Sequence, residues 1–554
     1  MIDFHPLPAF PHKGSKARKL AIVFALFAPV FAGLLALMLG QDANWDFRNY
    51  HWYNAYAFLN GRYGFDLLPS QLPYFYSPLI DLPYFLLAQV VSVKTSTFIM
   101  GAVQGINLLM IFMLAHTTLI IHNQRHKVLV CIALAILGFL GGGGIALIGT
   151  TFYDNITSIG LFLSALLALR FYPRMVNGPW GHAIALALLS GFPAGIMMGL
   201  KLPFVVFCVG LCGAFLFVTG PFLRRIMLSF GFGLGILLGL AITQAPWSLT
   251  LYQEYGNPVF PYFNTIFQSP FASPDMTRDL KFLPQSLWEM MTYPYIFTET
   301  PYRVGEIEWS DARILIIYIL LPVCVLVRLA FGRNKKAQDR LTSFYAMRYL
   351  LWLSVLSYFV WLALFSIYRY LVPLEMLTPL LIVLAMSLLP LKAQTRALLT
   401  ACLFLVIILS IQPGSWGRKT PWLDKPAEVA IPDIAYPDNL MILMAGFEPF
   451  SHIVPSFPPH IPFVRIQSNF ASPGEAKGIN DVIMKKVKEH QGPFMLVIPD
   501  WQYDLAKDAL KYFNLTFSPK NCLDIVDYLF DSRLKLCPID PLKGQPLTVK
   551  SPHE

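Results

Sequence analysis

Long apolar stretches recur along this chain, and the first, residues 20 to 40, follows a cluster of basic residues between positions 13 and 19. About 20 apolar residues cross the hydrocarbon core of a bilayer as a helix, and basic residues mark its cytoplasmic end. We therefore expect a cytoplasmic N-terminus and an outer loop from residue 41. The stretch is too long for a secretory signal and has no Ala-x-Ala ending, so we expect it to be retained.

Composition supports the same class of protein. Hydrophobic residues make up 56% of the chain and charged residues 13%, which is typical of a polytopic membrane protein. The formal net charge is +10, but the basic residues lie between apolar stretches and do not gather on one polar face. They indicate topology, and we expect no nucleic-acid partner.

The apolar stretches predict about eleven transmembrane helices by length. They lie near residues 20–40, 98–121, 128–149, 156–172, 182–199, 202–220, 226–245, 312–331, 345–365, 373–390 and 397–412. The basic clusters between them fall on one side only if residues 78–93 do not cross the membrane. This short segment contains Asp81 and Pro83, and we interpret it as an interfacial or re-entrant helix. An odd number of crossings then places the C-terminus outside.

The predicted fold is a polytopic α-helical membrane protein with a C-terminal extracytoplasmic α/β domain. We expect a transmembrane domain at residues 1–412, with outer loops at 41–97 and 246–311, and the second domain at 413–554. Acidic residues outnumber basic ones in the loop 246–311, the opposite of the cytoplasmic loops.

The C-terminal segment has the patterns of a soluble domain. Residues 440–445 and 494–498 resemble buried strands, whereas 479–490 and 503–513 have helical periodicity. It has no Gly-x-Gly-x-x-Gly motif and no phosphate-binding loop, so nothing in it indicates nucleotide binding.

Two of the seven cysteines, Cys522 and Cys537, lie outside the apolar stretches. They flank two strand-like runs, which is compatible with a hairpin closed by a disulfide in an oxidising compartment. Two buried free thiols are the alternative. No Cys-x-x-Cys or His-Glu-x-x-His spacing of metal ligands is present.

The apolar stretches themselves contain few ionisable residues, which argues against a transporter with an ion path at the midplane. We interpret Gln104, Asn107 and His116 as interhelical polar contacts.

Candidate site residues gather in the first outer loop. Asp42 and Asp46 are four residues apart, so a helical turn would bring both carboxylates to one face. Arg48 and His51 follow closely. An aromatic belt at the headgroups explains the tryptophans and tyrosines nearby, but it does not explain this polar run. A helix cap is the alternative explanation for Asp46.

Further candidates lie at the other predicted outer turns. Asp154 is either an ordinary polar turn residue or a second acidic group, and Lys201 either snorkels or contacts phosphate. Arg369, followed by Tyr370, could grip a phosphate bidentately at the outer end of a span. Asn257 belongs to a loop rich in proline and aromatic residues that faces either a sugar or the membrane surface.

Several phrases carry a resemblance to a known group. They are Trp45-Asp-Phe-Arg-Asn-Tyr-His-Trp-Tyr-Asn-Ala-Tyr-Ala-Phe-Leu-Asn-Gly-Arg62, Tyr153-Asp-Asn155, Gly199-Leu-Lys-Leu202, Tyr255-Gly-Asn-Pro-Val-Phe-Pro-Tyr-Phe-Asn264 and Tyr368-Arg-Tyr370. With the order of spans and loops, the chain resembles uncharacterised bacterial members of the GT-C superfamily of integral-membrane glycosyltransferases. The first loop lacks the adjacent Asp-Asp or Glu-Asp pair. The sequence thus leaves open whether a divalent cation, Mg²⁺ or Mn²⁺, takes part.

The resemblance implies transfer of a sugar from a polyprenyl-phosphate carrier to a saccharide, lipid or protein acceptor on the outer face of the plasma (inner) membrane. Asp46 is expected to be the general base and Arg369 the phosphate clamp, with Lys201, Tyr370, Arg48, His51, Asp154 and Asn257 in the substrate site. One base favours inversion at the anomeric carbon. The alternatives are a lipid-linked saccharide flippase or transporter, a glycan ligase, and a non-catalytic subunit of envelope assembly.

Overall fold

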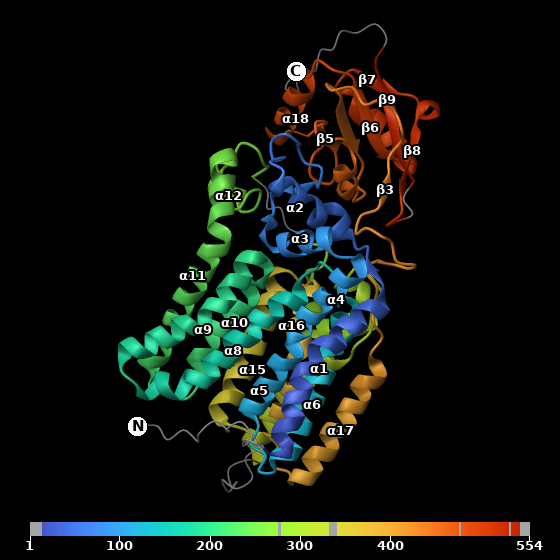
Figure 1. Ribbon diagram of the computed structural model, residues 1–554. Helices are drawn as coiled ribbons and strands as arrows, with labels where there is room; N and C mark the ends of the chain where they lie inside the picture. Colours follow the sequence, from blue (N-terminus) through green and yellow to red (C-terminus); the bar gives the residue numbers. More distant parts are fainter. Residues whose placement is uncertain (1–13, 275–278, 332–340, 476–477, 531–532, 543–554) are drawn as a thin grey trace. The chain divides into compact units, whose positions relative to one another are not determined.

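The computed structural model describes residues 14–274, 279–331, 341–475, 478–530 and 533–542 (Figure 1). The chain forms two compact units. Unit 1 comprises the described residues of Met1–Leu39, Thr97–Gln244 and Asp279–Trp416, and unit 2 those of Gly40–Ser96, Ala245–Arg278 and Gly417–Glu554.

Unit 1 is built from helices that run side by side (Figure 1). Its helices are α1 (Lys16–Leu39), the end of α4 (Val93–Gln104), α5 (Ile106–Thr118), α6 (Gln124–Phe139), α7 (Gly142–Ala146), α8 (Asp154–Asn177), α9 (Trp180–Leu200), α10 (Val205–Ala214), most of α11 (Phe222–Tyr255), α13 (Leu287–Glu299), α14 (Arg313–Phe331), α15 (Phe344–Leu364), α16 (Val372–Met386) and α17 (Ala393–Ser410).

Within the described residues, nine helical segments are long and apolar enough to cross a membrane, with α4 and α5 forming one of them. They make this a membrane-embedded protein. Close helix contacts depend on glycine, because a Cβ added at Gly195 of α9 would lie 2.1 Å from the carbonyl oxygen of Ile236 in α11. Small residues permit such backbone approach between membrane helices.

Two of the eleven predicted spans have shorter helices than expected. The predicted span 128–149 is interrupted, since α6 ends at Phe139 and α7 begins at Gly142. The predicted span 202–220 contains α10, which has 10 residues between short 3₁₀ turns. Residues 78–93 contain α3 (Leu82–Val90), whose 9 residues would extend only about 14 Å, too short to cross a bilayer core of about 30 Å.

Unit 2 contains a mixed sheet in the order β3-β8-β9-β6-β4-β5, with β7 paired to β9. The strands are β3 (Val429–Ala430), β4 (Met441–Ala445), β5 (Phe463–Gln467), β6 (Phe494–Pro499), β7 (Leu515–Phe517), β8 (Leu523–Asp527) and β9 (Arg533–Pro541). Strands β5, β4 and β6 are parallel, and β9 runs antiparallel to its neighbours. Helices α18 (Gly478–Glu489) and α19 (Tyr503–Lys511) pack on these strands. The α/β pattern predicted for this segment agrees with the structure.

The first predicted outer loop belongs to unit 2, with the sheet. Leu67 forms a parallel bridge to Val464 of β5, and the Leu67 backbone N–H donates to the carbonyl of Phe463. The Asp66 carboxylate accepts from the Phe463 N–H at 2.8 Å and pairs with Arg62 at 2.6 Å. Strand β1 (Gln41–Asp42) pairs with β2 (Arg418–Lys419). The structural division therefore differs from a boundary at residue 412, because backbone hydrogen bonds tie the loop to the C-terminal segment.

The disulfide that the sequence predicts joins Cys522 and Cys537. The register of the β8–β9 pair places Leu523 opposite Leu536, so the two cysteines lie directly across the hairpin from each other. The five other cysteines are free thiols.

Candidate functional site

Four of the predicted site residues of unit 1 lie in one cluster, which we call the cation cluster: Asp154, Lys201, Arg369 and Tyr370. The Lys201 ammonium is 2.7 Å from the Asp154 carboxylate and 5.3 Å from the centre of the Tyr370 ring. The Arg369 guanidinium lies 5.9 Å from the same ring centre. Three turns that are far apart in sequence thus converge on Tyr370.

Phe152 contacts both cations of the cation cluster. Its backbone carbonyl accepts a hydrogen bond from Lys201 at 2.6 Å, and its ring lies 4.1 Å from the Arg369 guanidinium. Trp416 packs edge-on with this ring, at 5.7 Å between centroids. Both cations are therefore held against aromatic surface, where a planar guanidinium stacks well.

Local structure explains how each member reaches the cluster. Tyr153 has a φ of 63°, and this left-handed residue begins α8, so that Asp154 occupies the first turn. A carboxylate is favoured there by the helix dipole. Lys201 follows the last residue of α9, and Arg369 lies in the 3₁₀ turn Tyr368–Leu371 that precedes α16. The side chains of Asp154 and Lys201 are 5% and 17% exposed, so water screens their attraction little.

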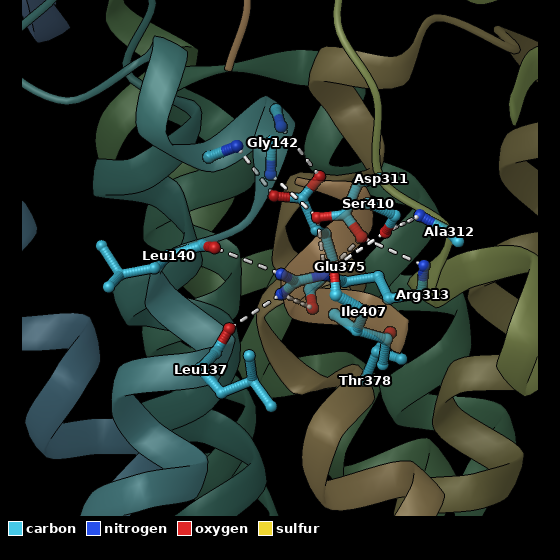
Figure 2. A network of polar contacts seen from close by, with 12 residues as sticks. Leu137, Leu140, Gly142, Asp311, Ala312, Arg313, Glu375, Thr378, Ile407 and Ser410 are labelled. Atoms are coloured by element: carbon cyan, nitrogen blue, oxygen red, sulfur yellow. Dashed lines mark hydrogen bonds and ion pairs between the residues drawn. The ribbon is translucent and has the colours of Figure 1, made fainter. Parts of the chain in front are cut away.

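A second polar network lies nearby in unit 1 and was missed by the sequence reasoning (Figure 2). Its core consists of Asp311, Arg313 and Glu375, all fully buried. The Glu375 carboxylate accepts from the backbone N–H groups of Gly143 (3.2 Å) and Gly144 (2.8 Å). Asp311 accepts from the N–H of Gly142 at 2.9 Å and pairs with Arg313 at 2.9 Å.

This network caps both ends of the break between α6 and α7. Arg313 donates to the carbonyls of Leu137 and Leu140 at the end of α6, while the two carboxylates accept from the start of α7 (Figure 2). Broken helices in a membrane need such internal partners, because lipid offers none. Only glycine fits here, since a Cβ at Gly141 would lie within 2 Å of Glu375.

The sequence analysis expected few ionisable residues in the spans. The buried network of Asp311, Arg313 and Glu375 corrects this expectation. Two signals pointed to the network: the run Gly141–Gly144, and Glu375 within an apolar stretch. The polar residues expected to make interhelical contacts do so in part. Gln104 binds the carbonyl of Leu147 and the N–H of Gly149, and Asn107 donates to the carbonyl of Asn155.

Unit 2 holds the other predicted residues, and two of them, Asp46 and His51, lie in what we call the acidic–aromatic cluster: Asp46, Tyr50, His51, Tyr76, Asp81 and Tyr262. Residues Phe47–His51 form a π-helical turn, a feature frequent at functional sites. The Tyr50 hydroxyl donates to Asp46 at 3.3 Å, and its ring packs on His51 and edge-on against Tyr76.

Beneath this surface His51 Nδ1 lies 2.6 Å from the Asp81 carboxylate, with both side chains at most 5% exposed. Tyr76 and Tyr262 share a hydrogen bond of 2.6 Å between their hydroxyls. Asp46, Tyr50, Tyr76 and Tyr262 are half-buried. The cluster thus presents one half-buried carboxylate that contacts the Tyr50 phenol, together with a buried imidazole–carboxylate pair.

One expectation for the first loop is wrong, and one alternative explanation of Asp46 does not apply. Asp42 does not share a helical turn with Asp46, because Asp42 belongs to strand β1 and accepts from Asn44 at 2.6 Å. Asp46 stands at the position before the π-helical turn, but its side chain makes no capping hydrogen bond to that turn. The alternative explanation of Asp46 as a cap therefore does not apply.

Arg48 and Asn257 have structural partners. Arg48 is buried, donates to the carbonyl of Ala43 at 3.1 Å and lies 3.6 Å from the centre of the Phe530 ring. Burial lowers the pKa of Arg48 to about 10, although Asp527, Glu448 and Asp42 oppose this shift. Asn257 is fully buried and donates to the carbonyl of Tyr262, so it shapes the loop that carries this tyrosine.

Metal ligands do not gather in the part of the chain that the structure describes: it contains no group of three or more His, Cys, Asp or Glu side chains placed to hold a metal ion.

Comparison with known proteins adds no assignment: no family model, no curated protein and no solved structure shows significant similarity to the chain.

Proposed function

We propose that this protein is a glycosyltransferase of the GT-C type, which moves a sugar from a polyprenyl-phosphate carrier to an acceptor hydroxyl. The observation that carries the proposal is the cation cluster, where Arg369 and Lys201 meet over Phe152 and Tyr370 at helix ends. A lysine and an arginine on an aromatic support suit a phosphate that is attached to lipid.

Arg369 is the stronger candidate to bind the donor phosphate. The charge of Lys201 is offset by Asp154 at 2.7 Å, and the Arg369 guanidinium is set against two aromatic rings. A guanidinium has the planar donor geometry that matches phosphate, which an ammonium lacks. Positive charge at this point stabilises the phosphate as it leaves the anomeric carbon.

Asp46 is the proposed general base. It is the half-buried carboxylate of the acidic–aromatic cluster, and a carboxylate beside a phenol ring suits a sugar ring with its hydroxyl groups. In the reaction the acceptor oxygen bonds to the anomeric carbon while its proton passes to Asp46. The bond from the anomeric carbon to the phosphate oxygen breaks, and its electron pair stays with the phosphate.

The proposed location is the plasma (inner) membrane, with the N-terminus in the cytoplasm and the active site and C-terminal domain outside. The acidic balance of residues 246–311 and the Cys522–Cys537 disulfide support an outer, oxidising compartment for unit 2. The transporter alternative gains little from the buried charges of unit 1. Asp311, Arg313 and Glu375 bind one another and backbone groups, as capping residues do.

The test is an in vitro transfer assay with the purified full-length protein and a panel of polyprenyl-phosphate sugars. Asp46→Asn should lower transfer about 100-fold or more while donor binding persists. Arg369→Ala should weaken donor binding about tenfold or more, because it removes a charge-assisted contact. Matched controls are Asp424→Asn, an exposed carboxylate of unit 2, and Arg348→Ala, a cation over the single ring of Phe344. Wild-type transfer by Asp46→Asn would contradict the assignment of the base.

A further inference from the structure

A cavity of about 630 Å³ opens in unit 1 between the start of α13 and the 3₁₀ turn Pro301–Arg303. This volume lies in the range of small-molecule sites. Arg303 fixes its walls, since it pairs with Glu289 at 2.7 Å and donates to the carbonyls of Lys281 and Leu283, both at 2.6 Å. The cavity is therefore preformed.

Charges around the cavity cancel. Lys281 and Arg303 are matched by Glu289 and Glu306, which also line it. Arg303 is bound to Glu289, and Lys281 lies 3.9 Å from Glu306 and 3.5 Å from Asp279. An anion would find no excess of positive charge here, whereas a neutral ligand with hydroxyl groups would find both donors and acceptors.

One wall of the cavity is Gly305, and behind it lies an indole N–H. A Cβ added at Gly305 would lie 3.6 Å from Nε1 of Trp309 and 4.0 Å from the ring of Trp416. Trp309 is 4% exposed, and its Nε1 has no hydrogen-bond partner among the described residues. A buried indole N–H normally finds an acceptor. The exposed ring of Tyr302 offers an apolar face on the same cavity.

The cavity adjoins the turn that carries Arg369. The carbonyl of Val304, beside Gly305, accepts from the Tyr368 N–H at 2.8 Å, and the Trp309 ring lies 3.9 Å from the Tyr368 ring. Tyr368 directly precedes Arg369. A ligand in the cavity would therefore contact the segment 302–306, which is hydrogen-bonded to the turn that carries Arg369.

We propose that this cavity is a saccharide subsite, which binds a neutral sugar ring through the Tyr302 face and the Glu289 and Glu306 carboxylates. The inference rests on the proposed function and extends it by naming a neutral glycan as the substrate class. The sugar belongs either to a free acceptor glycan or to a glycan on the lipid carrier.

The experiment is saturation-transfer NMR on the full-length protein in detergent. The probes are chitotriose, maltotriose, inorganic phosphate and a lipid-linked oligosaccharide. At least one trisaccharide should bind, and Tyr302→Ala should reduce binding about tenfold. Tyr295→Ala, an exposed tyrosine of α13 outside the cavity lining, should leave it unchanged.

Each outcome decides the proposal. Binding of a free trisaccharide indicates an acceptor site, and binding of the lipid-linked sugar alone indicates a donor site. Displacement of the sugar by phosphate, no binding at about 10 mM, or equal binding by all variants would overturn the subsite. Sugar binding that persists in a protein without transferase activity would overturn the reaction and leave the subsite standing.

Discussion

Removing the Glu375 side chain should strongly destabilise unit 1. Glu375→Ala takes away the acceptors of two buried backbone donors, the N–H groups of Gly143 and Gly144. A buried donor without a partner costs about 1–3 kcal/mol, so the expected loss is about 2–6 kcal/mol. This is a large part of a total stability of about 5–15 kcal/mol. The Asp311–Arg313 pair stays neutral as a whole, so hydrogen bonds and not net charge cause the loss.

Glu375→Gln provides the graded comparison. The amide keeps one acceptor oxygen, so one of the two N–H groups still has a partner. The free energy of unfolding should therefore fall by only about 1–3 kcal/mol. Glu308→Gln, an exposed acid of the same unit, is the control and should have little effect. The free energies of unfolding are measured by titration with a denaturing detergent. Dye labelling of the buried thiols of Cys131 and Cys324 reports the unfolded fraction. If Glu375→Ala unfolds at the same detergent concentration as Glu308→Gln, the capping role is refuted.

Three further predictions concern unit 2 and topology. Burial would raise the pKa of Asp527, but His452 at 3.0 Å and two backbone N–H groups outweigh it and lower the pKa below the usual value. The folded state then binds fewer protons than the unfolded state, so stability from this pair is present above about pH 4 and is lost as pH falls through the folded pKa. Thermal unfolding between pH 3 and 6 should show a shallower acid loss for Asp527→Asn; an unchanged slope would refute the linkage. Cys522→Ser should cost about 3 kcal/mol, because the disulfide closes a loop of 15 residues, and equal melting with and without reductant would contradict this. Accessibility mapping should label a cysteine placed at Asp500 from outside the cell, and cytoplasmic labelling there would exclude the proposed topology.

The sequence analysis placed the charged residues of the cation cluster at the ends of predicted spans, and the structure has them at helix ends. Asp154, Lys201 and Arg369 each interrupt or border a predicted span, and three helix ends bring them together around Phe152. Span length and basic clusters suffice to place such residues at helix ends. They do not reveal which ends converge, because that depends on helix packing over many residues.

Other features could not be read from local patterns. The four-residue spacing of Asp42 and Asp46 predicted one helical face, but pairing of β1 with the distant β2 overrides helical periodicity. Likewise, the stretch 128–149 reads as one span, because its interruption depends on Asp311, Arg313 and Glu375 from distant segments. Asp81 was assigned only to an interfacial helix, and its partner His51 lies 30 residues away in sequence. In each case the decisive partner is remote in the chain.

The most direct test of the proposed function is to locate the donor phosphate. A structure of the full-length protein in lipid nanodiscs with a bound polyprenyl-phosphate sugar would do so. We expect the phosphate oxygens about 3 Å from the Arg369 guanidinium, with the Lys201 ammonium in the same shell, and this density should be absent for Arg369→Ala. A lipid phosphate bound elsewhere, with Arg369 and Lys201 making no contact to it, would contradict the proposed function.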